Sequence, residues 1–406
     1  MGQHRPTSLT ADSAQNWVDD RSLRSSSVSS DPSSQNGERN FFVCLALVLV
    51  GCGMLMVHSA SITSWPTQFE RVYLSRHLTF LAIGLPLAWI TSLLRASFWR
   101  TWAPFFFLTT TALLLAVLIP GFGSRVNGAQ RWIRLGTWSL QPSEIAKVTL
   151  PLMMAWLLTC PLVQRSKSMI VRLSLVWPLF CMAPLIVLQP DLGTTVFLGL
   201  SMLIALFLGG WPFSYFVIAG LAMIPLAGTL LVLKPYQWER ITGFIQAWTD
   251  FNQAPYQLKQ SLVSLGAGGI QGVGIGQGWQ KLSFLPEANT DFVFAVVGEE
   301  LGLVGTLGLT LLWIGFYTSG LRILRHLPQH SFAAIAGITL LTQLVLQAAV
   351  NVAVVTAMVP PKGISHPFIS YGGSSLVISM ITVGLILSFS REESSSAEIH
   401  GTCDGC

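Results

Sequence analysis

The chain has 406 residues, of which 51% are hydrophobic and only 10% are charged, and its formal net charge is +5. A soluble domain carries about 25% charged residues. The composition therefore excludes an ordinary soluble protein and favours one embedded in a membrane.

Both ends of the chain differ from its middle. Residues 1–40 contain ten serines and almost no large aliphatic side chains, so they cannot bury enough apolar surface to fold. We expect them to form a disordered cytoplasmic tail. Residues 41–391 carry the apolar segments and form the membrane domain, and residues 392–406 form a second cytoplasmic tail.

Apolar runs of the length needed to cross a bilayer, about 20 residues, recur along the membrane domain. They are continuous rather than alternating, which excludes a lipid-facing β-barrel. The sequence predicts an all-α polytopic integral membrane protein with about ten transmembrane helices and a large extracytoplasmic loop, residues 234–291, between helices 7 and 8. The predicted spans are 41–62, 78–94, 101–120, 144–160, 171–189, 193–210, 213–233, 294–321, 331–355 and 374–390.

The charges between the spans predict an orientation. If the amino terminus lies inside, the short inner loops contain bases and no acid, as the positive-inside rule requires. Both termini are then cytoplasmic, and all nine acidic residues between Phe41 and Arg391 belong to the outer side. The inner bases are Arg95, Arg100, Arg165, Lys167, Arg172, Arg322 and Arg325.

Four of these nine acids lie in residues 284–302, where a polar loop enters a long apolar segment. An ionised group at the edge of hydrocarbon is costly unless it is paired or hydrated. The stretch therefore predicts a functional site at a membrane surface. For Glu299 and Glu300, pairing with bases on a neighbouring helix is an open alternative. The four acids are Glu287, Asp291, Glu299 and Glu300.

The first outer loop, from Gly121 to Lys147, contains Arg131 and Arg134 and ends in the first turn of a predicted helix. Lys147 follows Glu144 by three residues, which puts both side chains on one face of that helix. A local ion pair and an anion-binding lysine are both compatible with this spacing.

In the long loop 234–291, residues 236–251 interleave aromatic and charged side chains, which predicts a helix lying in the membrane interface. Residues 266–278 include seven glycines. Such a run allows close backbone approach to a ligand such as a phosphate, or it forms a flexible hinge. Both interpretations remain open.

Two further outer segments interrupt the apolar pattern. Residues 189–194 form a turn that carries a lone acid, Asp191. Residues 359–374 contain several prolines and glycines together with Lys362, His366 and hydroxyl groups. Irregular backbone at membrane depth must be buried in protein or line a wet cavity, so this segment predicts a pocket wall.

Six motifs, in this order, resemble the shape, elongation, division and sporulation (SEDS) family of bacterial cell-wall proteins, which includes FtsW, RodA and SpoVE. The resemblance covers about residues 41–391. The motifs are Arg131-Trp-Ile-Arg-Leu-Gly, Gln141-Pro-Ser-Glu-Ile-Ala-Lys, Gln189-Pro-Asp-Leu-Gly-Thr, Leu285-Pro-Glu-Ala-Asn-Thr-Asp-Phe, Gly298-Glu-Glu-Leu-Gly and Pro367-Phe-Ile-Ser-Tyr-Gly-Gly-Ser.

The resemblance implies a ten-helix enzyme of the bacterial cytoplasmic membrane that polymerises lipid II into peptidoglycan strands at the outer face. It also implies a partner, a class B penicillin-binding transpeptidase, and no nucleic acid. Pro286-Glu-Ala and Lys362-Gly-Ile look more like the FtsW branch than the RodA branch. We therefore expect a location at the division site, with other division proteins as partners. The chain has Asn289 where the family usually has His, and His366 where it usually has Leu.

Glycosyl transfer between two lipid-linked sugars needs a base for the attacking hydroxyl and cations near the leaving undecaprenyl pyrophosphate. By resemblance, Asp291 matches the family's essential aspartate and is the predicted base. The candidate pyrophosphate ligands are Arg131, Arg134, Lys147, Lys259 and Lys362. The predicted supporting residues are Glu144, Asp191, Glu287, Glu299, Glu300, Ser370 and Tyr371.

A divalent cation, Mg²⁺ or Mn²⁺, would help to neutralise the pyrophosphate, although the sequence shows no dedicated set of metal ligands. Three other functions are alternatives. A RodA-like polymerase would serve elongation and cell shape. A lipid II flippase or transporter would place charges in mid-span or show an internal repeat, and neither feature is evident. A scaffold that only recruits a transpeptidase would not need a lone Asp at an outer loop.

Overall fold

The computed structural model describes residues 32–61, 68–126, 129–136, 138–161, 163, 174–221, 225, 235–281 and 284–392. The predicted tails lie outside this part except for residues 32–40 and Glu392. Of the predicted span 213–233, residues 213–221 are helical and most of the remainder also lies outside it.

Helices account for most of the described chain. Five of them are long and apolar enough to cross a membrane, and three further apolar helices are shorter. The prediction of a polytopic helical membrane protein is therefore confirmed. The helices that match predicted spans are α2 (Pro32–Ser61), α3 (Gln68–Leu93), α4 (Ala96–Leu118), α5 (Pro142–Leu158), α8 (Trp177–Leu188), α9 (Leu192–Leu208), α13 (Val293–Leu324), α14 (Phe332–Val355) and α15 (Gly373–Phe389).

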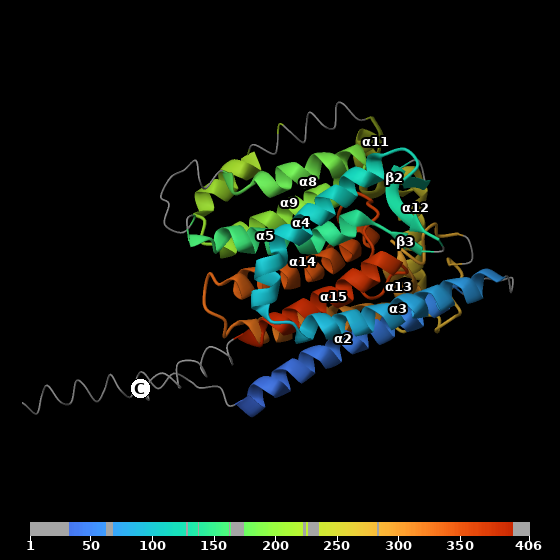
Figure 1. Ribbon diagram of the computed structural model, residues 1–406. Helices are drawn as coiled ribbons and strands as arrows, with labels where there is room; N and C mark the ends of the chain where they lie inside the picture. The colour runs from blue at the N-terminus through green and yellow to red at the C-terminus, as the bar shows by residue number, and fades with distance from the viewer. Residues whose placement is uncertain are drawn as a thin grey trace, which may run out of the picture.

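These helices lie side by side in one bundle, with α8 and α9 toward one side, α2 and α3 toward the other, and α14 and α15 between them (Figure 1). α15 packs against α3, α5 and α14, and α2 packs against α13. The Phe42 and Phe316 rings stack at 4.7 Å between α2 and α13. Leu303, Leu307 and Leu311 of α13 are exposed, as expected for side chains that face lipid.

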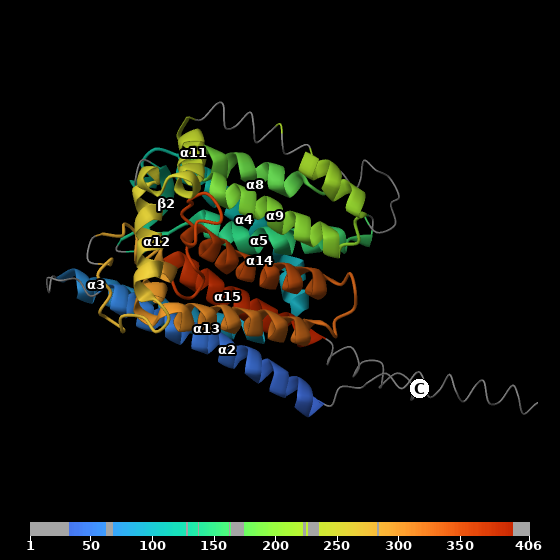
Figure 2. The same ribbon diagram turned by 180° about the vertical axis from the view of Figure 1, so that it is seen from behind.

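The long connections gather at one end of the bundle, which we call the loop end and define as residues 119–141, 189–191, 235–292 and 356–372. Figure 2 shows α11 (Pro235–Thr249) and α12 (Tyr256–Gly268) at this end, with α12 beside α13. α11 covers most of the segment for which an interfacial helix was predicted.

A small sheet at the loop end departs from the all-α prediction. Strands β1 (Gly123–Val126), β2 (Ala129–Leu135) and β3 (Trp138–Leu140) are antiparallel in the order β1-β2-β3. The backbone N–H and C=O groups of a connection need hydrogen-bond partners. In this connection, the three strands provide those partners for one another. The all-α description holds for the membrane helices but not for this loop.

The first helix begins earlier than the predicted boundary at residue 40. α2 starts at Pro32, and its first turns contact the end of the bundle opposite the loop end. Arg39 donates a hydrogen bond to the Ser390 carbonyl, and Glu38 lies 3.6 Å from Arg325. These charged residues therefore extend the helix, although composition alone assigned them to the tail.

α13 is interrupted at Gly302, where φ is 65° and ψ is −160°. The turn formed by residues 269–274 inserts at this point and exchanges backbone hydrogen bonds with α13. The bonds run from Val273 N to Glu299 O (3.0 Å), Gly274 N to Glu300 O (3.0 Å), Leu303 N to Gly269 O (2.9 Å) and Val304 N to Ile270 O (3.2 Å).

Glycines permit this insertion. A Cβ atom on Gly272 would overlap the Glu300 carbonyl, and one on Gly268 would overlap the Gly298 carbonyl. Gly272 also has a φ of 80°, which favours glycine. The glycine run thus packs against a helix, and its contacts support neither the phosphate site nor the hinge considered from the sequence.

Glu299 and Glu300 of α13 bind the loop residues that follow the inserted turn. Glu300 forms a fully buried ion pair with Lys281, at 2.6 Å, and accepts a hydrogen bond from Ser59 at 2.7 Å. The pairing interpretation is therefore correct for Glu300, with a base from the loop rather than from a neighbouring helix. Glu299 accepts hydrogen bonds from the backbone N–H groups of Trp279 (2.7 Å) and Gln280 (3.1 Å).

We expect Lys281→Met to destabilise the protein by roughly 3–5 kcal/mol, because it leaves the buried Glu300 carboxylate without its counter-charge. Thermal unfolding of the detergent-solubilised protein, followed by tryptophan fluorescence, measures the effect. The double variant Lys281→Met/Glu300→Gln should recover much of the loss. A Lys281→Met protein that unfolds like the parent would contradict this assignment.

Candidate functional site

The candidate site centres on a closed turn, residues 287–292, directly before α13. The backbone N–H groups of Thr290 and Phe292 both donate to the Glu287 carbonyl, at 3.1 and 3.2 Å. Thr290 Oγ1 also donates to the Glu287 carboxylate at 2.9 Å. These bonds set Asp291 at the entrance to the helix.

Three consecutive carbonyls of this turn each accept a hydrogen bond from another part of the chain. The pairs are Asn289 O with Tyr371 N (2.8 Å), Thr290 O with Ser370 Oγ (2.5 Å) and Asp291 O with Asn351 Nδ2 (2.7 Å). The turn is therefore fixed at every residue around Asp291. Ser370 and Tyr371, which were predicted to support the site, are two of the three anchors.

Asn351 is the third anchor, and sequence reasoning missed it. Its side chain, buried in α14, donates at 2.7 Å to both the Asp291 carbonyl and the Ile364 carbonyl. Gln347, one turn earlier, donates to the Ser365 carbonyl at 2.9 Å. Amides four residues apart lie on one helix face. Two such amides in an apolar span indicate a polar contact inside the bundle, and this spacing could have identified Asn351 from the sequence.

The side chain of Asp291 lies against Gly363. Its Oδ2 atom is 2.8 Å from the position that a Cβ atom on Gly363 would occupy, so the absence of a side chain makes room for the carboxylate. Two residues earlier, the Pro361 carbonyl accepts a hydrogen bond from Arg240 Nη1 at 3.0 Å. Arg240 belongs to α11 and was not among the predicted site residues.

Lys362 lies between these two contacts and reaches the start of α9. Its Cε atom is 2.7 Å from the position of a Cβ atom on Gly193. Asp191 precedes α9 and caps it, because its carboxylate accepts hydrogen bonds from the backbone N–H and the hydroxyl of Thr194. Lys362 therefore lies near Asp191, while the next residue, Gly363, contacts Asp291, so these three predicted residues belong to one region of the loop end.

The charges of this cluster influence one another. Burial raises the pKa of Asp291 to about 7; the carboxylate of Glu287 adds to the rise and Arg240 opposes it. Burial lowers the pKa of Lys362; Asp191 opposes this change and Arg240 adds to it. Asp291 can therefore hold or release a proton near neutral pH.

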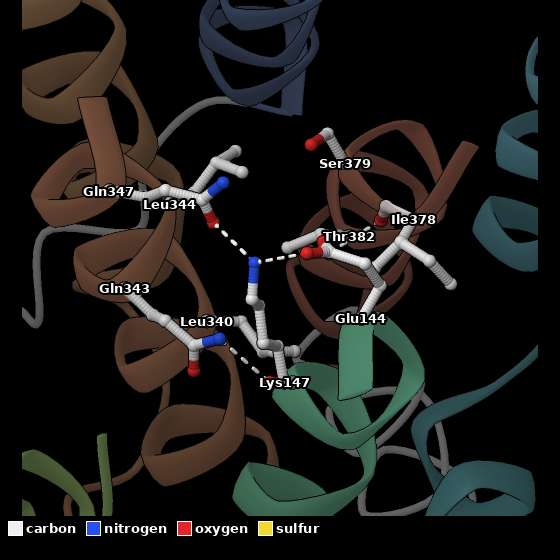
Figure 3. Close-up of a pocket in the computed structure, with 9 residues that line it drawn as sticks. All are labelled: Glu144, Lys147, Leu340, Gln343, Leu344, Gln347, Ile378, Ser379 and Thr382. Atoms are coloured by element: carbon white, nitrogen blue, oxygen red, sulfur yellow. Dashed lines mark hydrogen bonds and ion pairs between the residues drawn. The ribbon is translucent and has the colours of Figure 1, made fainter. Parts of the chain in front are cut away.

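Lys147 lies elsewhere, inside the bundle. It pairs with Glu144 at 2.7 Å and donates to Gln347 at 3.3 Å. Figure 3 shows the ammonium group between these partners in a small cavity bounded by α5, α14 and α15. The local ion pair considered from the sequence is therefore present, and Lys147 and Glu144 do not join the Asp291 cluster.

The other three predicted pyrophosphate ligands also have different surroundings. Arg131 donates to the carbonyls of Gln189 (2.8 Å) and Pro190, and so holds the turn that carries Asp191. Arg134 is exposed and points to the opposite face of β2, since strand side chains alternate. Lys259 lies over the Phe251 ring, 5.4 Å from its centroid. Of the five candidates, Lys362 is the one whose neighbour in the chain, Gly363, contacts the Asp291 carboxylate.

Two residues that the sequence analysis singled out, His366 and Asn289, flank the site. His366 is completely buried, packs against Trp313 with 5.5 Å between ring centroids, and has a pKa lowered to about 4 by burial. It is therefore neutral and contributes no charge near Asp291. Asn289 participates through its carbonyl, which any residue would provide.

The described residues contain no group of three or more His, Cys, Asp or Glu side chains that could hold a metal ion. Two carboxylates, Glu287 and Asp291, lie near each other, but a dedicated cation site needs more ligands than this.

Comparison with known proteins connects this architecture to a family. Residues 39–395 match the family described as "Cell cycle protein", that of FtsW, RodA and SpoVE. The chain belongs to this family. It is 39% identical to a probable peptidoglycan glycosyltransferase FtsW of Coxiella burnetii, over 87% of this chain and 96% of that protein. It is 34% identical to stage V sporulation protein E of Bacillus subtilis, over 86% and 96%.

Comparison with solved structures leads to the same family. The chain resembles the rod shape determining protein RodA of Thermus thermophilus, with a TM-score of 0.64 and 25% identity over 86% of this chain and 96% of that one. It also resembles a chain of a peptidoglycan synthase complex, with a TM-score of 0.70 and 28% identity over 86% and 97%. The family resemblance drawn from the six motifs is thus confirmed.

We expect Asn351→Leu to lower the free energy of unfolding by about 1–3 kcal/mol, because two buried carbonyls lose their donor. Asn252→Leu, which replaces an exposed amide of the same loop end, should change stability far less. Melting of both purified variants in detergent gives the comparison. Equal melting temperatures would show that Asn351 does not hold the turn.

Proposed function

We propose that the chain is a peptidoglycan glycosyltransferase that joins lipid II units into glycan strands, with Asp291 as its general base. The position of Asp291 carries this proposal. Its turn is anchored at three carbonyls, and its carboxylate has a pKa of about 7. The segment that contacts this carboxylate carries Lys362 and accepts a hydrogen bond from Arg240. The relatives named as peptidoglycan glycosyltransferases support the reaction class.

The proposed reaction uses each group in turn. The 4-hydroxyl of the acceptor N-acetylglucosamine attacks the anomeric carbon of the donor sugar. The Asp291 carboxylate takes the proton from that hydroxyl as the new C–O bond forms. The bond between the anomeric carbon and the lipid diphosphate breaks, and the diphosphate leaves with the bonding electrons. A base with a pKa near the working pH suits such a proton transfer.

The proposal includes a location in the bacterial cytoplasmic membrane, with both termini in the cytoplasm and the loop end outside. The short connections that the structure describes at the opposite end of the bundle contain bases and no acids, which supports this orientation. Arg95, Arg322 and Arg325 belong to that end, whereas Asp191 and Asp291 belong to the loop end.

We further propose a class B penicillin-binding transpeptidase as partner and septal wall synthesis as the cellular role. A structurally similar chain belongs to a complex that couples polymerization and crosslinking, which supports the partner. Several relatives carry the name FtsW, which supports division over elongation. A fluorescently tagged copy should concentrate at mid-cell together with other division proteins; an even distribution along the lateral wall would favour elongation.

Asp291→Asn should fold but lose polymerisation by roughly 10²–10⁴-fold, since it keeps the shape of the side chain and removes the proton acceptor. Asn289→Ala is the matched control in the same turn and should retain most of the activity. The measurement is the formation of glycan chains from labelled lipid II in detergent. No bilayer is present there, so a lipid flippase would produce no glycan. Parental rates in Asp291→Asn would remove Asp291 as the base.

The rate should depend on pH through Asp291. A base acts when deprotonated, so kcat/KM should rise with pH and reach half its plateau at about pH 7. Glu287→Gln removes a negative charge that raises the Asp291 pKa, so the rise should move to lower pH. A pH profile of Glu287→Gln that coincides with the parental profile would contradict the coupling of these two carboxylates.

A further inference from the structure

We propose that Lys362 and Arg240 form a binding subsite for a lipid-linked diphosphate beside Asp291, which receives the leaving group of the reaction. This inference rests on the proposed function, since it names the part of the substrate that this side of the site would hold. Arg240 was absent from the predicted ligands. Of the five predicted ligands, Arg131, Lys147 and Lys259 have other partners, and Arg134 is exposed.

Three consecutive residues, Pro361, Lys362 and Gly363, bring the two cations and the proposed base together. Pro361 accepts the hydrogen bond from Arg240, and Gly363 provides the space that the Asp291 carboxylate fills. The Lys362 side chain leaves the backbone between these two contacts. The cations and the carboxylate are therefore fixed relative to one another by one short segment.

The Lys362 ammonium group has no hydrogen-bond partner or ion pair among the residues that the structure describes. Its surroundings disfavour its charge, because burial and the nearby guanidinium of Arg240 both lower its pKa. The nearby Asp191 carboxylate compensates in part, but it already accepts two hydrogen bonds from Thr194. A bound anion would supply the missing counter-charge, and two adjacent cations suit a diphosphate better than a single phosphate.

The start of α9 also favours binding of a phosphate group near Lys362. Lys362 packs against Gly193, the second residue of α9. The N-terminus of a helix carries partial positive charge and backbone N–H groups that bind phosphates. A phosphate held by Lys362 would therefore lie close to this helix end.

α11 indicates why the diphosphate would be attached to a lipid. Trp238, Ile245 and Trp248 are exposed on the helix that carries Arg240. Exposed aromatic and aliphatic side chains on an amphipathic helix suit the membrane interface, which is the depth of lipid phosphates. Trp248 also donates to the Ala357 carbonyl at 2.8 Å, which ties α11 to the segment that carries Lys362.

The test uses the purified full-length protein in detergent and farnesyl diphosphate as a short lipid-linked diphosphate, with binding measured by calorimetry. Lys362→Met and Arg240→Met should each weaken binding by about tenfold or more, because each removes a charge-assisted contact. Arg125→Met, which removes an exposed cation of β1 at the same end, should bind like the parent. Farnesyl monophosphate should bind the parent more weakly than the diphosphate.

Arg240→Met also removes the hydrogen bond to Pro361, so Arg240→Lys is included to keep the charge. Melting temperatures show which variants are folded. Undiminished diphosphate binding by a folded Lys362→Met protein would overturn the proposal, as would equal affinity for the monophosphate. Binding does not require catalysis, so the parent and Asp291→Asn should both bind farnesyl diphosphate. Failure of Asp291 as the base would leave that result unchanged.

Discussion

The irregular backbone around Asp291, at the end of an apolar bundle, depends on one buried amide that joins two of its segments. The Asn351 side chain donates to two carbonyls, those of Asp291 and Ile364, which belong to segments far apart in the chain. An unpaired carbonyl in such surroundings is costly. Gln347, one helical turn away from Asn351, donates a hydrogen bond to the Ser365 carbonyl. α14 thus provides the fixed donors against which both loops are positioned.

The acidic residues in and next to the loop end have different surroundings and different roles. Glu300 neutralises a buried lysine, Glu299 binds backbone N–H groups, and Asp191 caps a helix. Among the described residues, Asp291 has no basic ion-pair partner and its carboxylate caps no helix, and burial favours its protonated form. Its side chain is therefore available for proton transfer in the proposed reaction.

The sequence predicted those features that are encoded locally. Long apolar runs specify helices wherever they occur, and six short motifs suffice to identify the family. The grouping of charged side chains was not predictable in the same way. Arg131, Lys259 and Lys362 are similar cations of the loop end. Only the folded chain shows that Lys362 lies against Gly193, next to the glycine that contacts Asp291, while Lys259 lies over Phe251. Asn351 was missed because its role depends on carbonyls about 60 and 13 residues away.

The insertion of the glycine turn into α13 has a consequence for how this region can vary. Four backbone hydrogen bonds close the base of a loop that runs from 275 to 298 and contains Asp291. Lengthening a closed loop is inexpensive, about 0.6 kcal/mol for each doubling of its length. Moving Gly272 or Gly302 by one position would instead put a Cβ atom into backbone. Natural variants of this fold can therefore acquire insertions in the loop around the Asp291 carboxylate, while Gly272 and Gly302 stay in place at its base.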